Sequence, residues 1–114
     1  MRHHTEIVPF ELAVKLKKVG YPQLIKNGVY AENGQYLELD REYLVFPFIS
    51  APTYADVFDW LMENGYAVVM MPEINTWDAE VYEIGKGQQA VICIKEKDNW
   101  YAVASEAIEK TLEL

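Results

Sequence analysis

The sequence has very little of the chemistry that most enzymes use. Its 114 residues include one cysteine, Cys93, and two histidines, His3 and His4, both near the N-terminus. Nucleophilic catalysis needs a Ser, Cys or Thr beside a base such as histidine, and zinc needs Cys and His at close spacings. We therefore expect no catalytic residues of this kind, no metal site and no cofactor.

Long apolar runs are missing as well. No stretch of about 18 apolar residues occurs, and the N-terminal segment lacks the continuous apolar core of a signal peptide. A single cysteine forms no internal disulfide, so nothing in the sequence calls for an oxidising compartment. These absences predict a cytoplasmic protein that neither spans nor binds a membrane.

Basic residues are scarce, and they are unevenly placed. The chain has 10 Lys and Arg against 18 Asp and Glu, a net charge of -8. Residues 1–30 carry +3, whereas residues 31–114 carry -11. A mostly acidic surface repels phosphate backbones, so direct nucleic-acid binding is not expected. The lysines at positions 15, 17 and 18 suit the C-terminal end of a helix, where the helix dipole favours cations.

What remains is the composition of a folded protein. Hydrophobic residues make up 51% of the chain and aromatic residues 13%, with five prolines and six glycines. Two halves of this length would each bury little core, so we expect a single domain over residues 1–114. Residues 1–7 are expected to be flexible, as chain ends often are.

Three segments carry apolar residues at helical spacing. Proline, threonine and asparagine stand at their first positions, which suits a helix start. A glycine follows the first two segments, where a left-handed backbone commonly ends a helix. We therefore expect helices over residues 9–19, 53–64 and 99–113.

Between the first two helices the pattern changes to that of strands. In the stretch GVYAENGQYLEL, Asn33-Gly34 separates two short runs rich in Val, Tyr and Leu, which predicts a hairpin. The run EYLVFPF, residues 42–48, follows. Pro47 cannot donate a ladder hydrogen bond, so this run is expected to be an edge strand or an extended lead-in.

Three further strands are expected between the second and third helices. The run YAVVMMPEI, residues 66–74, is apolar almost throughout, which is typical of a central strand. The runs DAEVYEIG and QAVICIKE, residues 78–85 and 89–96, follow it with turn residues between them. The sequence thus predicts an α+β fold with two layers, in which three helices pack on an antiparallel β-sheet made of a hairpin and a three-stranded meander.

Three stretches carry a family resemblance: ELAVKLKKVGYPQ in the first helix, SAPTYADVFDWLMENG at the second, and the closing WYAVASEAIEKTLEL. Together they resemble small uncharacterised proteins of prophages and mobile elements in gut Bacteroidales. The resemblance covers most of the chain and implies an accessory role in a phage or mobile element. Its motifs are structural, so it implies no catalytic or ligand-binding residues.

The remaining candidates for chemistry are carboxylates and Cys93. Asp56 and Asp59 lie one helical turn apart, and Asp78 and Glu80 lie on one face of a strand. The helical pair is explained by capping and by the helix dipole. A further alternation, at positions 38, 40 and 42, has the oxygen ligands that a hard cation uses, although a charged turn that protects a sheet edge explains it better. Cys93 lies in an expected strand and is interpreted as a small buried side chain.

Aromatic residues at the ends of the expected elements are candidates for a contact surface. Exposed rings are enriched in protein interfaces, and rings at such boundaries also cap the ends of a core. Both interpretations stay open for Tyr54, Trp77, Tyr82 and Trp100.

We therefore expect a non-enzymatic binding or assembly module that acts through a protein partner, including a second copy of itself. The first alternative is an acidic decoy that occupies the nucleic-acid-binding site of another protein. The second is a small hydrolase or ligand-binding domain that uses carboxylates. That alternative requires a deep pocket holding at least two of the acids named above.

Overall fold

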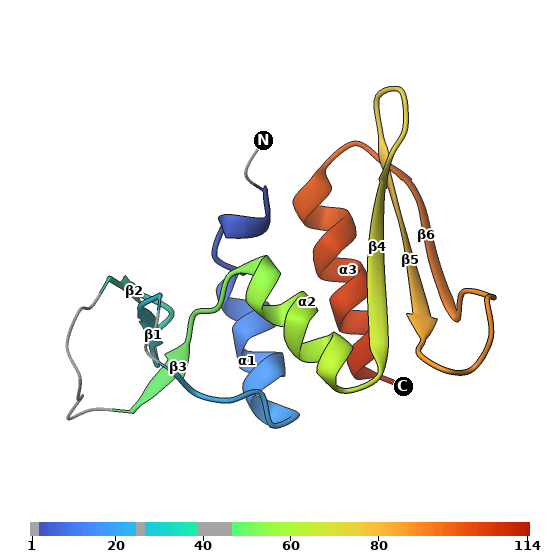
Figure 1. Ribbon diagram of the computed structural model, residues 1–114. Helices are drawn as coiled ribbons and strands as arrows, with labels where there is room; N and C mark the ends of the chain where they lie inside the picture. Colours follow the sequence, from blue (N-terminus) through green and yellow to red (C-terminus); the bar gives the residue numbers. More distant parts are fainter. Residues whose placement is uncertain (1–2, 25–26, 39–46) are drawn as a thin grey trace. The chain divides into compact units, whose positions relative to one another are not determined.

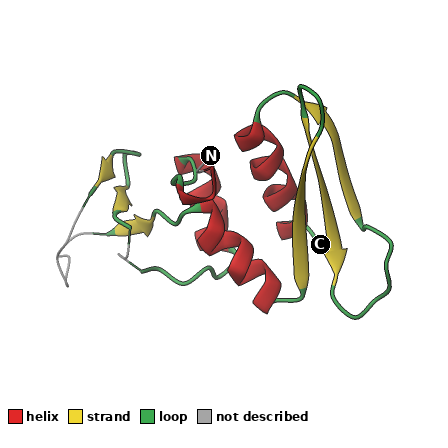
Figure 2. Ribbon diagram, turned by 45° about the horizontal axis from the view of Figure 1, so that its top comes forward, coloured by secondary structure: helices red, strands yellow, loops and turns green. Residues whose placement is uncertain are grey.

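The computed structural model describes residues 3–24, 27–38 and 47–114, and these residues form three α-helices and two three-stranded antiparallel sheets (Figures 1 and 2). The predicted α+β class is thereby confirmed. The chain divides into two compact units, Arg2–Ala55 and Asp56–Leu114, here called the N-terminal and C-terminal units. The expected hairpin and meander belong to separate sheets, one in each unit. The expectation of a single domain stays a prediction.

The N-terminal unit has three short strands in the order β2-β1-β3, with both pairs antiparallel. Strands β1 and β2 form the predicted hairpin, in which the Gly34 N–H donates to the Ala31 carbonyl at 2.9 Å. Strand β3 lies at the other edge of this sheet, as expected for the run that contains Pro47, but it covers residues 48–50 and shares only Phe48 with the expected residues 42–48. Residues 42–46 of that run lie outside the described residues. In chain order the elements of this unit are η1 (His3–Thr5), α1 (Phe10–Lys18), β1 (Val29–Ala31), β2 (Tyr36–Leu37) and β3 (Phe48–Ser50).

The segment before α1 is hydrogen-bonded to the segment that leads into the next helix. Ile7 forms an isolated antiparallel bridge with Thr53, and the Val8 N–H donates to the Pro52 carbonyl at 2.9 Å. The Tyr54 N–H donates to the Glu6 carbonyl at 3.0 Å. The flexibility expected for residues 1–7 stays a prediction. Of these residues the structure describes 3–7, and Ile7 forms the bridge to Thr53.

The apolar face of α1 is buried, as its spacing predicts. Leu12, Ala13 and Leu16 are at most 1% exposed. The Tyr30 hydroxyl donates to the Val8 carbonyl at 2.6 Å, which satisfies a polar group inside this unit. Burial raises the pKa of the Tyr30 phenol above its ordinary value, because a phenolate is poorly solvated there.

The C-terminal unit contains most of α2 and a meander of three longer strands in the order β4-β5-β6. Figure 2 shows α3 lying along one face of this sheet, so the unit has one helical layer on one sheet layer. The elements are α2 (Tyr54–Glu63), β4 (Tyr66–Pro72), β5 (Trp77–Glu83), β6 (Ile92–Lys97) and α3 (Trp100–Leu112).

The core of the C-terminal unit lies between α3 and the sheet. Ala79, Val81 and Ile94 from the strands pack with Val103 and Ala107 from α3, and all five are at most 2% exposed. Five partly buried side chains surround them: Tyr66, Val68, Met70, Trp77 and Ile92. Alternate residues of each strand therefore face α3, as the pleat of a sheet requires.

The three helices begin and end within one residue of the predicted bounds. Asn99 precedes α3, and its side-chain oxygen accepts hydrogen bonds from the N–H groups of Tyr101 and Ala102, at 2.8 and 3.1 Å. Gly65 follows α2 with a φ of 98°, the left-handed conformation that the sequence predicts at that position.

The predicted position of β4 in its sheet is wrong. The apolar run was expected to be a central strand, yet β4 lies at the edge and β5 occupies the centre. The expectation rests on apolar residues at successive positions, which normally means burial on both faces. In this unit only the face toward α3 is covered by a helix, and Val69 on the other face is 41% exposed.

Candidate interaction site

The face of the β4-β5-β6 sheet opposite α3 is not covered by a helix of the C-terminal unit, and we call it the open face. Strand alternation places these residues on it: Ala67, Val69 and Met71 from β4, Asp78, Glu80 and Tyr82 from β5, and Cys93 and Lys95 from β6. Val91, directly before β6, is 47% exposed. The β4 side of this face is apolar, whereas β5 and β6 contribute polar groups.

Glu80 contacts two other side chains of the open face, Tyr82 and Cys93. The Tyr82 hydroxyl donates to Glu80 Oε1 at 2.9 Å, and Cys93 Sγ lies 3.9 Å from Glu80 Oε2. The hydrogen bond to Glu80 raises the pKa of the Tyr82 phenol above its ordinary value, because an ionised phenol no longer donates to the carboxylate. Cys93 is exposed, so its expected burial is wrong: its strand position faces away from α3.

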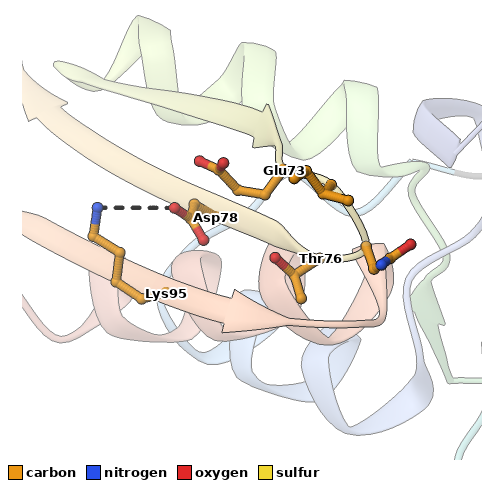
Figure 3. Close-up of a pocket in the computed structure, with 6 residues that line it drawn as sticks. Glu73, Thr76, Asp78 and Lys95 are labelled. Atoms are coloured by element: carbon orange, nitrogen blue, oxygen red, sulfur yellow. Dashed lines mark ion pairs between the residues drawn. The ribbon is translucent and has the colours of Figure 1, made fainter.

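A polar pocket lies at the other end of the sheet, beside the β4–β5 turn (Figure 3). Its residues are Glu73, Ile74, Asn75, Thr76, Asp78 and Lys95. Lys95 Nζ lies 3.8 Å from Asp78 Oδ2, across neighbouring strands. The Asp78 side chain is 8% exposed, against 61% for Lys95. The pocket contains Asp78 but not Glu80, so it does not join the pair of acids that the hydrolase alternative requires.

The outer edge of β4 is the second feature of this unit. The Ile84 N–H donates to the Gly65 carbonyl at 2.8 Å, and the Glu73 N–H donates to the Thr76 carbonyl at 2.9 Å. Hydrogen-bonded pairs alternate along an antiparallel ladder, so the odd-numbered residues of β4 bond to β5. The backbone groups of the even-numbered residues point away from β5. Within the described ranges, no other strand pairs with that edge.

The four aromatic residues expected to form a contact surface do not come together as one. Tyr54 and Trp100 are buried, at 1% and 3% exposure, so neither ring is presented at the surface. Trp100 packs instead against Phe58 and Tyr101, with ring centroids 6.2 and 5.4 Å apart. For these two rings the core-capping interpretation describes the structure better.

The other two rings lie on opposite faces of β5. Trp77 packs with the core on the α3 side, whereas Tyr82 is half-buried on the open face. Tyr82 alone of the four therefore belongs to the candidate site. The sequence did not predict the outer edge of β4 as a candidate site, because its apolar run predicts a central strand. Strand order depends on contacts between distant segments, so no local sequence pattern indicates it.

Residues 3–24, 27–38 and 47–114 contain no group of three or more His, Cys, Asp or Glu placed to hold a metal ion. Glu38 is exposed, and its expected partners Asp40 and Glu42 lie outside the described residues. None of the helices in these ranges has the length and apolar character needed to cross a membrane.

Comparisons with known proteins identify no relative of this chain. No family model matches the chain, and neither the curated proteins nor the solved structures contain a significant match.

Proposed function

We propose that this chain is a non-enzymatic protein-binding or assembly module that associates with copies of itself. One observation supports the proposal more than any other: β4 has the composition of a central strand and lies at the edge of its sheet. Native proteins usually protect edge strands with charges, prolines or short length. Over its seven residues, β4 has no charged side chain and only a terminal proline.

The distribution of charge makes this strand the favourable point of contact. The C-terminal unit from Asp56 onward contains twelve acidic and four basic residues, which accounts for the whole net charge of -8. Two such units repel each other over most of their surfaces. The uncharged strand β4 adds no repulsion of its own at the contact, and burying its apolar side chains, including the exposed Val69, favours association.

The experiment that tests self-association is the measurement of molar mass by light scattering from about 1 µM to about 1 mM protein. We expect the mass to rise from the 13.2 kDa of one chain toward twice that value as the concentration increases. A constant mass of one chain throughout the series would remove self-association from the proposed function.

The acidic decoy is a second candidate, favoured by the concentration of all net charge in one unit. Such a decoy competes with nucleic acid for a basic site on another protein. Host lysate is bound to DNA-cellulose, and this chain is then added at low salt. Specific release of a DNA-binding protein supports the decoy, whereas no release beyond that caused by an unrelated protein of equal charge contradicts it.

The accessory role in a phage or mobile element rests on the sequence resemblance alone. A pull-down from lysate of the native host, followed by mass spectrometry, identifies a different protein partner where one exists. We expect phage or mobile-element proteins among the captured partners if that role is correct.

A further inference from the structure

We propose that two copies of this chain pair through the outer edges of their β4 strands. The pairing is antiparallel and joins the two three-stranded sheets into one continuous sheet, in the order β6-β5-β4-β4′-β5′-β6′, where primes denote the second copy. This inference rests on the self-association proposed above. It specifies that the contact is the outer edge of β4, that the partner is a second copy of the chain, and which residues lie opposite each other. In the paired state β4 is a central strand, which is the position that its apolar sequence predicts.

The backbone of β4 supplies the hydrogen bonds for this pairing. Tyr66, Val68 and Met70 direct their N–H and C=O groups away from β5, as the ladder parity at both ends of the strand shows. A second β4 in antiparallel orientation presents the same groups in reverse order. The edge is therefore complementary to itself, as a contact around a two-fold axis requires.

Pro72 selects the register. When Val68 of one copy lies opposite Val68 of the other, Tyr66 lies opposite Met70, and every outward N–H of β4 meets a carbonyl. Pro72 then falls beyond the ladder. When Val69 lies opposite Val69, Pro72 faces Tyr66 instead, and the proline ring is directed at the carbonyl of the other strand. We therefore assign the register that is centred on Val68.

Side chains on both faces of β4 suit this register. On the open face, Ala67 of one copy lies beside Val69 of the other, and both are uncharged. On the face toward α3, Val68 lies beside its own counterpart, so the partly buried row of Tyr66, Val68 and Met70 continues across the two-fold axis. Apolar residues on both sides of the new ladder lose water when the strands pair.

The other edge of the sheet is less suited to pairing. Strand β6 carries Lys95 and Lys97, which are exposed. Its ladder with β5 is irregular between Trp77 and Ala79. Charges and bulges are the features that keep edge strands from pairing. The contrast between a protected and an unprotected edge in one sheet points to β4.

Cysteine cross-linking tests the register directly. In a Cys93→Ser background, one preparation carries Ala67→Cys and another carries Val69→Cys. In the assigned register these positions face each other at a Cα separation of about 4.5 Å, within disulfide range. Identical positions lie about 7–8 Å apart on the diagonal, which disfavours a disulfide. We expect a cross-linked dimer from the mixture under mild oxidation and little from either preparation alone.

Two results overturn the register: no cross-link in the mixture at concentrations where the parent chain self-associates, or ready cross-linking of Val69→Cys alone. The second result would place Val69 opposite Val69.

A matched pair of substitutions separates edge pairing from contact through the open face. Val69 and Val91 are exposed to similar extents, 41% and 47%, and only Val69 lies on β4. We expect Val69→Lys to weaken self-association about tenfold or more, because it adds a charge at the paired edge. Val91→Lys is expected to change it less than about threefold. Equal weakening by both would overturn edge pairing in favour of a contact through the open face.

Val68→Pro provides an independent measurement. Proline is tolerated at an edge strand whose N–H faces solvent, so the single chain should keep its circular dichroism spectrum. The substitution removes an outward N–H at the centre of the proposed ladder, and we expect self-association to be lost. Persistence in folded Val68→Pro overturns edge pairing while leaving self-association itself established. A parent chain that stays monomeric would instead contradict the proposed function and this inference together.

Discussion

Single side chains complete hydrogen bonding at the ends of elements, and Asn99 is the clearest example. Its Oδ1 accepts from two N–H groups of the first turn of α3. We expect Asn99→Ala to lower the free energy of unfolding by about 1 kcal/mol, because these donors lose their acceptor. Urea denaturation measures the change. Asn99→Asp is the control, because it keeps an acceptor in place, and an equal loss in this variant would contradict the capping role.

The hydrogen bond between Tyr82 and Glu80 makes a contribution to stability that depends on pH. It raises the pKa of the Tyr82 phenol above the ordinary value of 10.0. The unfolded chain releases this proton first, so the stabilisation is complete below the unfolded pKa and is lost as pH rises through the folded pKa.

We expect NMR titration to find that Tyr82 ionises at higher pH than free tyrosine, and that Glu80→Gln lowers the pKa of Tyr82. An unchanged pKa in Glu80→Gln would show that the carboxylate is not the cause.

At the scale of elements, the β1–β2 hairpin depends on a close approach at Gly28. This residue has a φ of 101°, and a Cβ there would lie 2.7 Å from the Leu37 carbonyl oxygen. Gly85 has a φ of 84°, but a Cβ there would have nothing within 4 Å. Gly28→Ala therefore combines backbone strain with a steric conflict, whereas Gly85→Ala has the strain alone.

We expect Gly85→Ala to cost about 1–2 kcal/mol of unfolding free energy and Gly28→Ala to cost more, by about 1–3 kcal/mol. Thermal denaturation of the two variants compares them. Equal losses would mean that the β1–β2 ladder moves to accommodate the methyl group.

At the scale of the whole molecule, net charge opposes association. Two copies that each carry -8 repel, and added salt screens this repulsion as the Debye length falls from about 30 Å at 0.01 M to about 8 Å at 0.15 M. We therefore expect self-association to strengthen over this range, as measured by sedimentation equilibrium. Weakening with salt would indicate a contact between opposite charges and contradict pairing through the uncharged β4 strand.

Much of the fold could be predicted from local sequence patterns. Helix bounds followed from apolar spacing, from Asn99 and from Gly65, because capping and left-handed turns act over a few residues. The Asn33-Gly34 hairpin was found for the same reason. Strand alternation, which has a period of two, places Ile92 and Ile94 on the same face of β6, and the structure shows that this face packs toward α3.

Much less of the candidate site could be predicted from the sequence. Of the four predicted rings only Tyr82 lies on the open face, because a ring at an element boundary packs inward or outward according to its neighbours in space. Tyr54 and Trp100 are buried for that reason. The exposure of Cys93 depends likewise on which face of β6 meets α3.

The sequence by itself determined the α+β class, the extents of the helices and the hairpin, and the concentration of negative charge after residue 30, because these depend on residue type and short-range spacing. Only the tertiary structure decided that the strands form two sheets and that the apolar β4 lies at the edge of one. Strand order depends on hydrogen bonds between segments distant in sequence, and these leave no local periodicity. The sequence shows that β4 is apolar and the structure shows that it lies at an edge, so the contrast between the two appears only when sequence and structure are combined.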